Sequence, residues 1–563
     1  MNDIRRTILW VIFGFSMVLL WDQWQVYNGH KATFFPSPAK PGVVAAPVPT
    51  ASVPGVTPAQ APVSSSQIAT AETTQASAPR EQLVVTTDVL KLTFDTEGGS
   101  LVRTEYLKHR DLTDQSKNFV LLDQSADRVY VAQTGLIAGS ANAAFPTHKT
   151  VMTIASAERE LKDGSNELTV KFESPEVGGV KLLKTYTLKR GSYELSVKHE
   201  VVNRGKDPVA PQLYFQLVRD GNKLAGASSF YSTFTGPAVY TEAKKYQKVE
   251  FSDIEKNKFE IEKQSENGYI AMVQHYFASA WLLADGIKRD LFMRKVDTNL
   301  YAVGMIATLP AIAPGASQSM DARLFVGPQE EKVLETMAPG LELVKDYGWL
   351  TILAKPLYWL LDKLHSVLQN WGWSIVALVV LLKIAFYWLN AKAYASMAKM
   401  KAINPRIMEM RERLKDNPQQ MQQEMMRIYR EEKVNPMGGC LPIVIQIPVF
   451  IALYWVLLSS VEMRNAPWML WIKDLSAADP YYILPLLMTL STMLQTALNP
   501  APPDPMQAKM MWFMPLVFSV MFFFFPAGLV LYWLTNNILS IAQQWIINKR
   551  MGVPPQFNLP KFR

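Results

Sequence analysis

The sequence predicts an α-helical polytopic membrane protein with six transmembrane helices, five of them in a C-terminal core, and one large all-β domain on the outer side. Apolar stretches of membrane-spanning length occur near the N-terminus and after residue 370, whereas the middle has ordinary polarity. Short runs of alternating polar and apolar residues fill that middle. Basic residues collect in the loops of one side. A chain of 563 residues also exceeds the usual length of one soluble domain.

Residues 1–24 are predicted to be a signal-anchor helix. Arg5 and Arg6 precede an apolar run from Ile8 to Trp21, the order of a secretory signal. No small-x-small cleavage site follows, so we interpret the segment as an uncleaved anchor, the alternative being a cleaved signal peptide. The N-terminus then lies in the cytoplasm and the chain from residue 25 onward is exported.

Residues 25–80 are predicted to be a tether, and residues 81–345 a β-sandwich. The tether is rich in Pro, Ala, Val, Thr and Ser and cannot bury a core. In the sandwich, Leu168, Val170 and Phe172 exemplify apolar residues that alternate with polar ones between turn signals. His199 and His275 lack an acid or base partner at an informative spacing, so we expect structural roles for both.

Residues 346–370 are predicted to form an amphipathic helix that lies in the membrane interface. Apolar residues recur there every three or four positions, whereas Lys355 and Asp362 fall elsewhere on the helical wheel. The apolar stripe consists of Leu350, Leu353, Leu357, Leu360, Leu364 and Val367.

Residues 371–548 are predicted to be a core of five membrane spans. Several are near the minimum spanning length, which implies tilt or a locally thin bilayer. Basic residues are concentrated in a long loop, 391–435, and in the tail, 549–563, so both are expected in the cytoplasm and the β domain outside. The spans are 371–390, 440–460, 481–499, 511–525 and 528–547.

Lys383 is the one formally charged residue in the first core span, and charge at membrane depth is a functional-site hypothesis by default. It lies roughly 10 Å from the cytoplasmic end of its helix. One interpretation is that the lysine snorkels to the lipid headgroups. The sharper interpretation is a hydrated groove that opens to the cytoplasm, and such a groove needs polar neighbours.

Polar residues at three- and four-residue spacing supply those neighbours on other spans. They face one side of each helix, and they either line a groove or hold the helices together by hydrogen bonds. No carboxylate lies in these spans, which argues against a proton relay. The predicted groove residues are Lys383, Gln446, Thr489, Thr492, Gln495, Asn536, Ser540 and Gln543, with Tyr532 on the same stripe.

The loop 391–435 is predicted to be a helical hairpin that Asn417 and Pro418 divide. Its apolar stripes are rich in methionine and are expected on the inside of the hairpin, where most of these residues simply form its core. Its basic face can meet lipid headgroups or ribosomal RNA. The methionines are Met397, Met400, Met410, Met421 and Met425.

The sequence carries no sign of an enzyme. No phosphate-binding loop, nucleophile elbow or zinc-protease motif occurs. The single cysteine, Cys440, excludes an intramolecular disulfide, and the six histidines form no metal-spaced cluster. We therefore expect no catalytic residue, no metal and no cofactor.

The block from Tyr394 to Gln544 resembles the YidC/Oxa1/Alb3 family of membrane protein insertases, of the Gram-negative bacterial YidC type. A stretch of the middle region, 271–277, is similar to the periplasmic β-supersandwich of that family. The strings that carry the resemblance are Ser396-Met397-Ala398-Lys399-Met400, Glu432 to Cys440, Asp479 to Pro485, Asp504-Pro505-Met506-Gln507 and Pro526 to Tyr532.

The resemblance implies a chaperone and insertase that folds inner-membrane proteins through a hydrophilic groove open to cytoplasm and lipid. Its expected partners are nascent membrane proteins, the ribosome, the lipid bilayer and the Sec translocon (SecYEG and SecDF). The groove arginine of the family aligns with Lys383, which keeps the charge but not the planar fork. The aromatic pair that faces the client aligns with Tyr532 and Trp533.

Two other function classes stay open at this point. A secondary transporter of a small solute predicts internal repeats and broken helices, and no clear repeat is visible. A membrane-anchored periplasmic carbohydrate-binding protein predicts that deletion of the β domain abolishes function, whereas an insertase tolerates that deletion.

Overall fold

The computed structural model describes residues 80–111, 114–138, 144–224, 233–414, 417–432, 441–499, 505–552 and 557. The predicted signal anchor, the tether before residue 80 and most of the tail lie outside these residues. Contacts divide the described chain into two units. The first contains the described residues up to 224 with Glu250–Gln264 and Lys288–Ala322, and the second contains Thr233–Val249, Ser265–Ile287 and the chain from Arg323.

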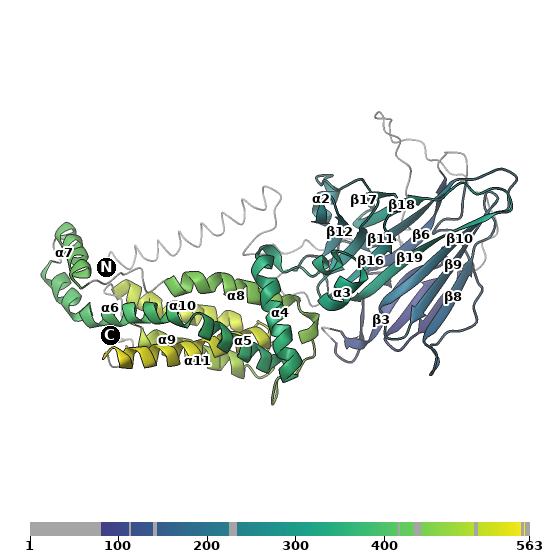
Figure 1. The fold of residues 1–563 in the computed structure, drawn as a ribbon. Helices are drawn as coiled ribbons and strands as arrows, with labels where there is room; N and C mark the ends of the chain where they lie inside the picture. The colour runs from purple at the N-terminus through teal and green to yellow at the C-terminus, as the bar shows by residue number, and fades with distance from the viewer. Residues whose placement is uncertain are drawn as a thin grey trace. The chain divides into compact units, whose positions relative to one another are not determined.

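Two β-sheets make up the region from residue 82 to residue 328 (Figure 1). The first has the order β1-β2-β3-β6-β11-β18-β17-β14, with β4 beside β3 and β5 beside β6. Its strands are β1 (Gln82–Thr86), β2 (Leu90–Asp95), β3 (Ser100–Arg110), β4 (Asn118–Val120), β5 (Asp123–Gln124), β6 (Val129–Ala138), β11 (Pro211–Asp220), β14 (Gln264–Ser265), β17 (Arg289–Asp297) and β18 (Leu300–Thr308).

The second sheet has nine strands in the order β13-β12-β15-β16-β19-β10-β9-β8-β7. Strand β19 runs from the first unit into the second. The strands are β7 (Thr153–Ile154), β8 (Glu167–Glu173), β9 (Val180–Lys189), β10 (Glu194–Asn203), β12 (Gly236–Thr241), β13 (Lys245–Lys248), β15 (Tyr269–Gln274), β16 (Phe277–Leu283) and β19 (Ser317–Pro328).

Aromatic side chains fill the space between the sheets in the first unit. The ring of Phe94 on β2 lies 5.7 Å from that of Phe172 on β8 and 4.8 Å from that of Tyr186 on β9, measured between centroids. The alternating residues Leu168, Val170 and Phe172 are all buried. The predicted β-sandwich is therefore confirmed in its pattern of inward-facing residues.

A lysine and a histidine also lie within this sandwich. Lys184 is fully buried, and its Nζ donates to the carbonyls of Gly98 (2.6 Å) and Thr134 (2.7 Å). Burial lowers the pKa of Lys184 to about 7, because the charged form loses its hydration. His199 Nε2 lies 2.9 Å from Thr134 Oγ1, with no carboxylate beside it, as expected for a structural histidine.

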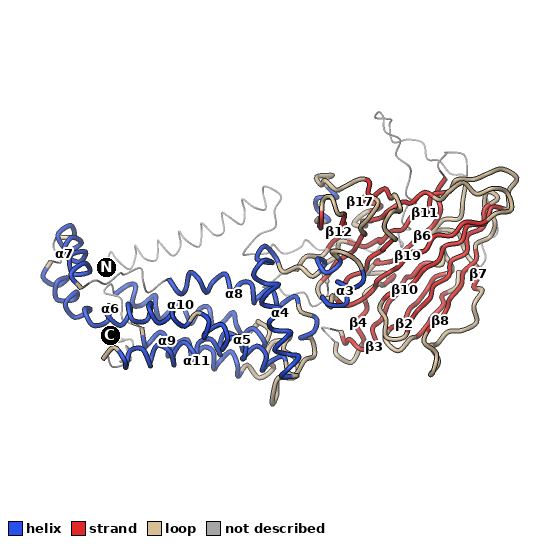
Figure 2. The backbone as a smooth tube through the Cα atoms, viewed as in Figure 1, coloured by secondary structure: helices blue, strands red, loops and turns tan. Residues whose placement is uncertain are grey.

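The helices follow the sheets in sequence, apart from one short helix (Figure 2). The last four predicted spans correspond to α8 to α11 within a few residues. The helices are α2 (Phe251–Glu255), α3 (Glu331–Met337), α4 (Thr351–Leu368), α5 (Trp371–Ala385), α6 (Tyr387–Arg413), α7 (Pro418–Glu431), α8 (Leu441–Ser459), α9 (Ile483–Leu498), α10 (Pro505–Phe522) and α11 (Ala527–Arg550).

The first predicted span, 371–390, is not one helix, which corrects that prediction. Helix α5 ends at Ala385, Phe386 leaves the helical conformation, and α6 continues after a bend of 68°. Neither proline nor glycine stands at this break. Helix α6 then runs on to Arg413, so the first hairpin helix begins at Tyr387 and not at residue 391.

Within the described residues, no single helix is both long and apolar enough to cross a membrane alone. Helices α5 and α6 meet that criterion together, across their bend. The apolar segments Gln446–Ser459, Ile483–Leu498 and Lys509–Phe522 are shorter. The number of six spans therefore stays a prediction.

Helix α4 buries a face that overlaps its predicted apolar stripe. Ala354, Tyr358 and Leu361 are buried against the bundle. In the predicted stripe, Leu350 is buried and Leu357, Leu360 and Leu364 pack partly buried against the bundle, whereas Leu353 is 37% and Val367 is 79% exposed. The helix thus packs on the bundle by one face and leaves apolar residues on another, as an interfacial helix requires.

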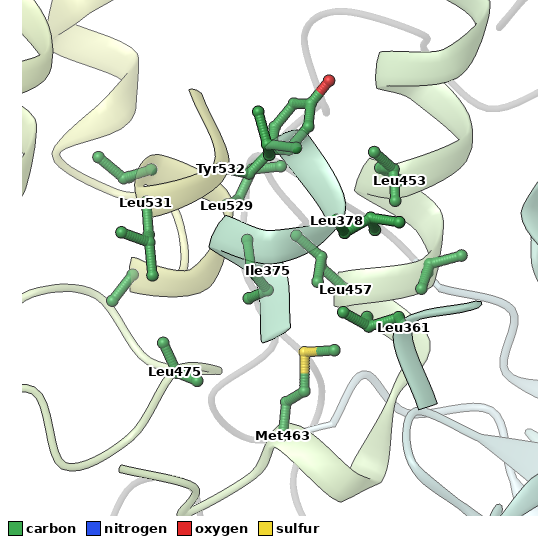
Figure 3. Close-up of a cluster of buried hydrophobic side chains, with 14 of the residues drawn as sticks. Leu361, Ile375, Leu378, Leu453, Leu457, Met463, Leu475, Leu529, Leu531 and Tyr532 are labelled. Atoms are coloured by element: carbon green, nitrogen blue, oxygen red, sulfur yellow. The ribbon is translucent and has the colours of Figure 1, made fainter. Parts of the chain in front are cut away.

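A shared apolar core joins α4, α5, α8 and α11. Figure 3 shows part of it, with Leu361, Ile375 and Leu457 directed toward one another from three helices. Tyr532 stands at its edge, with its hydroxyl directed away from the apolar side chains (Figure 3). This core fixes the helices that surround the candidate site.

A buried ion pair joins the segment before α4 to the turn after α8. Lys345, whose side chain has no exposed surface, donates through Nζ to both carboxylate oxygens of Glu462 (3.0 and 3.1 Å). The hydroxyl of Tyr358 donates to the same carboxylate (2.7 Å), and the Lys345 ammonium lies 4.0 Å from the centroid of that tyrosine ring. Glu462 therefore ties α4 to the end of α8.

Candidate functional site

A pocket among the helices contains four of the predicted polar and aromatic site residues. Its volume is about 440 Å³ including its open mouth. The predicted residues Lys383, Gln446, Asn536 and Tyr532 line it, and they come from α5, α8 and α11. The other lining residues are Val379, Leu382, Phe386, Leu389, Asn390 and Val449.

Lys383 enters this pocket from the last turn of α5, just before the break at Phe386. Its Nζ donates a 2.7 Å hydrogen bond to Ser540 Oγ on α11. The predicted groove residue Ser540 is buried. The Lys383 ammonium is therefore hydrogen-bonded to a neighbouring helix, whereas the snorkelling interpretation has it extend to the lipid headgroups.

The predicted polar stripe on α9 does not line the pocket. The hydroxyls of Thr489 and Thr492 donate to the carbonyls of Pro485 and Met488 one turn earlier (2.8 and 2.9 Å). Thr492 also accepts a 2.9 Å hydrogen bond from Asn537 Nδ2 of α11. The bond from Asn537 joins α9 to α11, the alternative that the sequence had left open, whereas the bond of Thr489 stays within its own helix.

The two remaining groove candidates also lie away from the pocket. Gln543 is buried, and its Nε2 donates to the carbonyl of Tyr387 at 3.3 Å, which links α11 to the first residue of α6. Gln495 is partly buried on α9. On the polar stripe of α11, Asn536 therefore lines the pocket, whereas Gln543 bonds the backbone where α6 begins after the break.

Sequence reasoning missed Asn390, which lines the pocket, and Asn537, which joins α11 to α9. Asn390 was assigned to the end of a straight span, because the break at Phe386 was not predicted. Asn537 follows Asn536 directly and lies about 100° further round the helix, so it faces α9 and not the pocket.

The predicted aromatic pair points in two directions. Tyr532 lines the pocket and is 3% exposed. Trp533 packs between two other rings, with its centroid 4.5 Å from that of Phe450 and 5.1 Å from that of Phe522. Only Tyr532 of this pair therefore presents its side chain to the pocket.

Helices α6 and α7 form the predicted hairpin. Ile403, Ile407, Met410 and Ile428 make its buried core, and the predicted residues Met400, Met421 and Met425 pack partly buried against that core. Met397 is partly buried and lies outside the cluster. The methionines thus serve the hairpin core first, while their partial exposure leaves an adaptable apolar edge.

Ion pairs hold the outer surface of the hairpin together. Arg406 of α6 pairs with Glu431 and Glu432 at the end of α7 (3.1 and 2.9 Å), and Arg427 pairs with Glu431 along α7 (2.8 Å). Exposed pairs of this kind stabilise by less than about 1 kcal/mol each. The pairs of Arg406 therefore join the two helices only weakly.

Comparison with known proteins gives consistent results over nearly the whole chain. The family model of the YidC periplasmic domain matches residues 82–360, and that of the 60Kd inner membrane protein matches residues 363–553. A membrane protein insertase YidC from Ralstonia nicotianae is 55% identical over 98% of both chains. The namesake from Bordetella pertussis is 54% identical over the same shares.

Solved structures give weaker likenesses. A crystal structure of an active YidC insertase with its first transmembrane domain resolved matches 82% of this chain and 91% of its own, with 18% identity and a TM-score of 0.38. A galactose mutarotase related enzyme from Lactobacillus acidophilus matches 44% of this chain and 97% of its own, with 9% identity and a TM-score of 0.30.

Proposed function

Because the chain belongs to the YidC family of membrane protein insertases, we propose that the pocket around Lys383 receives the client segments that it inserts. The protein is an inner-membrane insertase with a periplasmic β domain, and the transporter and carbohydrate-binding alternatives are not favoured. What the family leaves open is which residues of this chain meet the client.

The observation that carries the proposal is a single positive charge in a pocket of mixed polarity. Lys383 shares the pocket with Asn390, Gln446 and Asn536, and no carboxylate is among the lining residues. Lys383 is partly buried, and such a cation attracts polar and acidic groups more strongly than one in bulk water, because the local dielectric is lower. The ammonium thus draws the hydrophilic segment of a client, and Tyr532 contacts its flank.

Release follows from the client itself. Once the polar segment has entered, the apolar helix of the client leaves water for lipid, which contributes roughly 25 cal/mol per Å² of apolar surface. This drives insertion without nucleotide hydrolysis by the chain. A locally thin bilayer at the short spans lowers the barrier for the polar segment.

The hairpin α6–α7 is proposed to contact the client first, together with the ribosome or the Sec translocon. Its methionine edge suits varied apolar segments, and its exposed lysines and arginines suit anionic surfaces. The proposed topology has six spans, both termini in the cytoplasm and the β domain in the periplasm. It follows the basic loop 391–435 and the basic tail.

The decisive test replaces Lys383 by Ala and by Arg in cells depleted of the native protein, with a single-span client that carries an acidic translocated segment. We expect Ala to slow insertion at least several-fold and Arg to retain most of it, because charge and not fork geometry attracts the segment. Wild-type insertion rates for the Ala variant would contradict the role of the charge.

Crosslinking locates the client contact independently. A photoreactive residue at position 532 should crosslink to a stalled nascent chain, whereas one at position 533 is the matched control, because Trp533 does not line the pocket and packs against Phe522. Equal crosslinking from both positions would contradict the assignment of Tyr532 as the client-facing residue.

A further inference from the structure

We propose that three carboxamide side chains in the pocket, those of Asn390, Gln446 and Asn536, bind the main chain of the client segment that crosses the membrane. The inference rests on the proposed function of the pocket and adds what the pocket recognises besides charge. Its ligand is an extended, uncharged stretch of polypeptide whose backbone N–H and C=O groups have left water.

The three carboxamides reach one pocket from three different helices. Asn390 comes from α6, Gln446 from α8 and Asn536 from α11. Apolar side chains such as Val379 and Val449 make up most of the remaining wall. A polar group in such surroundings is costly unless it finds a hydrogen-bond partner, so these three amides need one.

The protein itself supplies no such partner. None of the three carboxamides makes a side-chain hydrogen bond to any residue that the structure describes. Asn390 is in addition only 7% exposed, so an almost fully buried amide lines the pocket without a partner. The pocket therefore presents donors and acceptors that a bound segment can use.

Two carboxamides of α11 that join helices show the contrast. Asn537, which follows Asn536 in sequence, donates to Ser491 Oγ (3.1 Å) and Thr492 Oγ1 (2.9 Å) of α9. Gln543 donates to the backbone at the start of α6 (3.3 Å). A helix-joining role thus leaves hydrogen bonds in the structure, and the pocket carboxamides have none among the described residues.

The chemistry of a carboxamide matches that of the peptide group. Its NH₂ donates and its C=O accepts, so it can pair with a backbone C=O or N–H in any sequence. A lysine ammonium only donates, so Lys383 favours acidic segments. Each backbone group that lacks a partner in the membrane costs several kcal/mol, and the carboxamides lower that cost for the segment that crosses.

Two single-span clients separate main-chain recognition from charge attraction. The translocated segment of one contains only Gly and Ala, so all of its polar groups belong to the main chain, and the other has acidic residues in the same segment. Asn390→Leu, Gln446→Leu and Asn536→Leu are made singly and together in the full chain, in cells depleted of the native protein. Thr535→Val is the matched control, because its hydroxyl bonds the carbonyl of Leu531 on its own helix (2.8 Å).

We expect each single variant to slow insertion of both clients roughly 2- to 10-fold, about the effect of one neutral hydrogen bond, and the triple variant to slow it further. Thr535→Val should leave both rates unchanged, and Lys383→Ala should slow only the acidic client. Wild-type insertion of the Gly/Ala client by the triple variant would overturn the proposal. Slow insertion by the triple variant together with normal insertion of the acidic client by Lys383→Ala would support main-chain recognition and contradict the proposed role of the charge instead.

Thermal unfolding in detergent tests whether the pocket carboxamides hold helices together. The three pocket variants should melt no lower than wild type, because they remove no hydrogen bond between described residues. Asn537→Leu should melt several degrees lower, because it removes the two bonds to α9. A melting temperature of the pocket variants as low as that of Asn537→Leu would show a structural role and overturn the proposal.

Discussion

The buried pair of Lys345 and Glu462 gives an asymmetric prediction about stability. Glu462→Gln removes the negative charge but nearly keeps the shape, and Lys345→Met removes the positive charge in the same way. Lys345 has no exposed side-chain surface, whereas Glu462 is 18% exposed. Each single change therefore leaves a different ion without its partner, and the two residual ions differ in their access to water.

The magnitudes follow from what each variant leaves behind. In Glu462→Gln the fully buried ammonium keeps one neutral acceptor, the face of Tyr358 and the longer-range attraction of Glu330 and Glu331, so we expect a cost near the lower end of the about 3–5 kcal/mol of a broken buried pair. In Lys345→Met the carboxylate keeps the hydroxyl of Tyr358 and some water, so we expect about 1–3 kcal/mol. Replacing both residues together should cost less than the sum by at least about 2 kcal/mol.

The assay is thermal unfolding of the full chain in detergent, followed by tryptophan fluorescence. A chain of this size is not two-state, so the order of the melting temperatures is compared and not an absolute free energy. We expect wild type highest, Lys345→Met next and Glu462→Gln lowest, with the double variant above Glu462→Gln. Additive effects, or the reverse order of the single variants, would refute the reasoning.

Three further predictions concern other parts of the structure. Burial lowers the pKa of His275 to about 4. The stability that the neutral imidazole contributes above the ordinary pKa of 6.5 is therefore lost as the pH falls from 6.5 toward 4. Over that range the melting temperature of His275→Gln should fall less than that of the wild type. Gly268→Ala places a Cβ 1.9 Å from the carbonyl oxygen of Tyr240 at φ +88° and should lower the melting temperature by several degrees, whereas Gly286→Ala, at φ +84° in open space, should show only the smaller effect of the strained φ. Ile407 is buried in the hairpin core, so Ile407→Ala should lower the local stability of the hairpin by about 2–4 kcal/mol and speed its cleavage by a protease. Met408 is 49% exposed, so Met408→Ala should leave the cleavage rate unchanged.

The long apolar segments of the sequence predicted where helices α8 and α9 begin and end, because the length and composition of such a segment determine which residues can be buried. Helix α8 runs from Leu441 to Ser459, against a predicted 440–460, and α9 from Ile483 to Leu498, against 481–499. The division of the hairpin at Asn417 was also predicted, and there the asparagine side chain accepts from the backbone N–H of Gln420 and caps α7. Local chemistry determined these features.

The break at Phe386 was not predictable in the same way. No proline, glycine or polar cluster marks it, so the sequence pattern runs on as if the helix were continuous. Because of this one error, Asn390 was left out of the predicted site. The polar stripe of α9 was misplaced for another reason, since helical spacing shows which residues share a face but not which neighbour that face meets.

The continuity of α6 beyond that break has a mechanical consequence. One helix of 27 residues begins at the pocket wall and ends at the hairpin tip, a rod of about 40 Å. A rotation of about 5° at its base moves the far end by roughly 3–4 Å, about the width of a side chain. The helix can therefore act as a lever arm, most easily bent at Pro405, and convert a weak pull at its tip into a small, forceful displacement at its base, where Gln543 donates to the carbonyl of Tyr387.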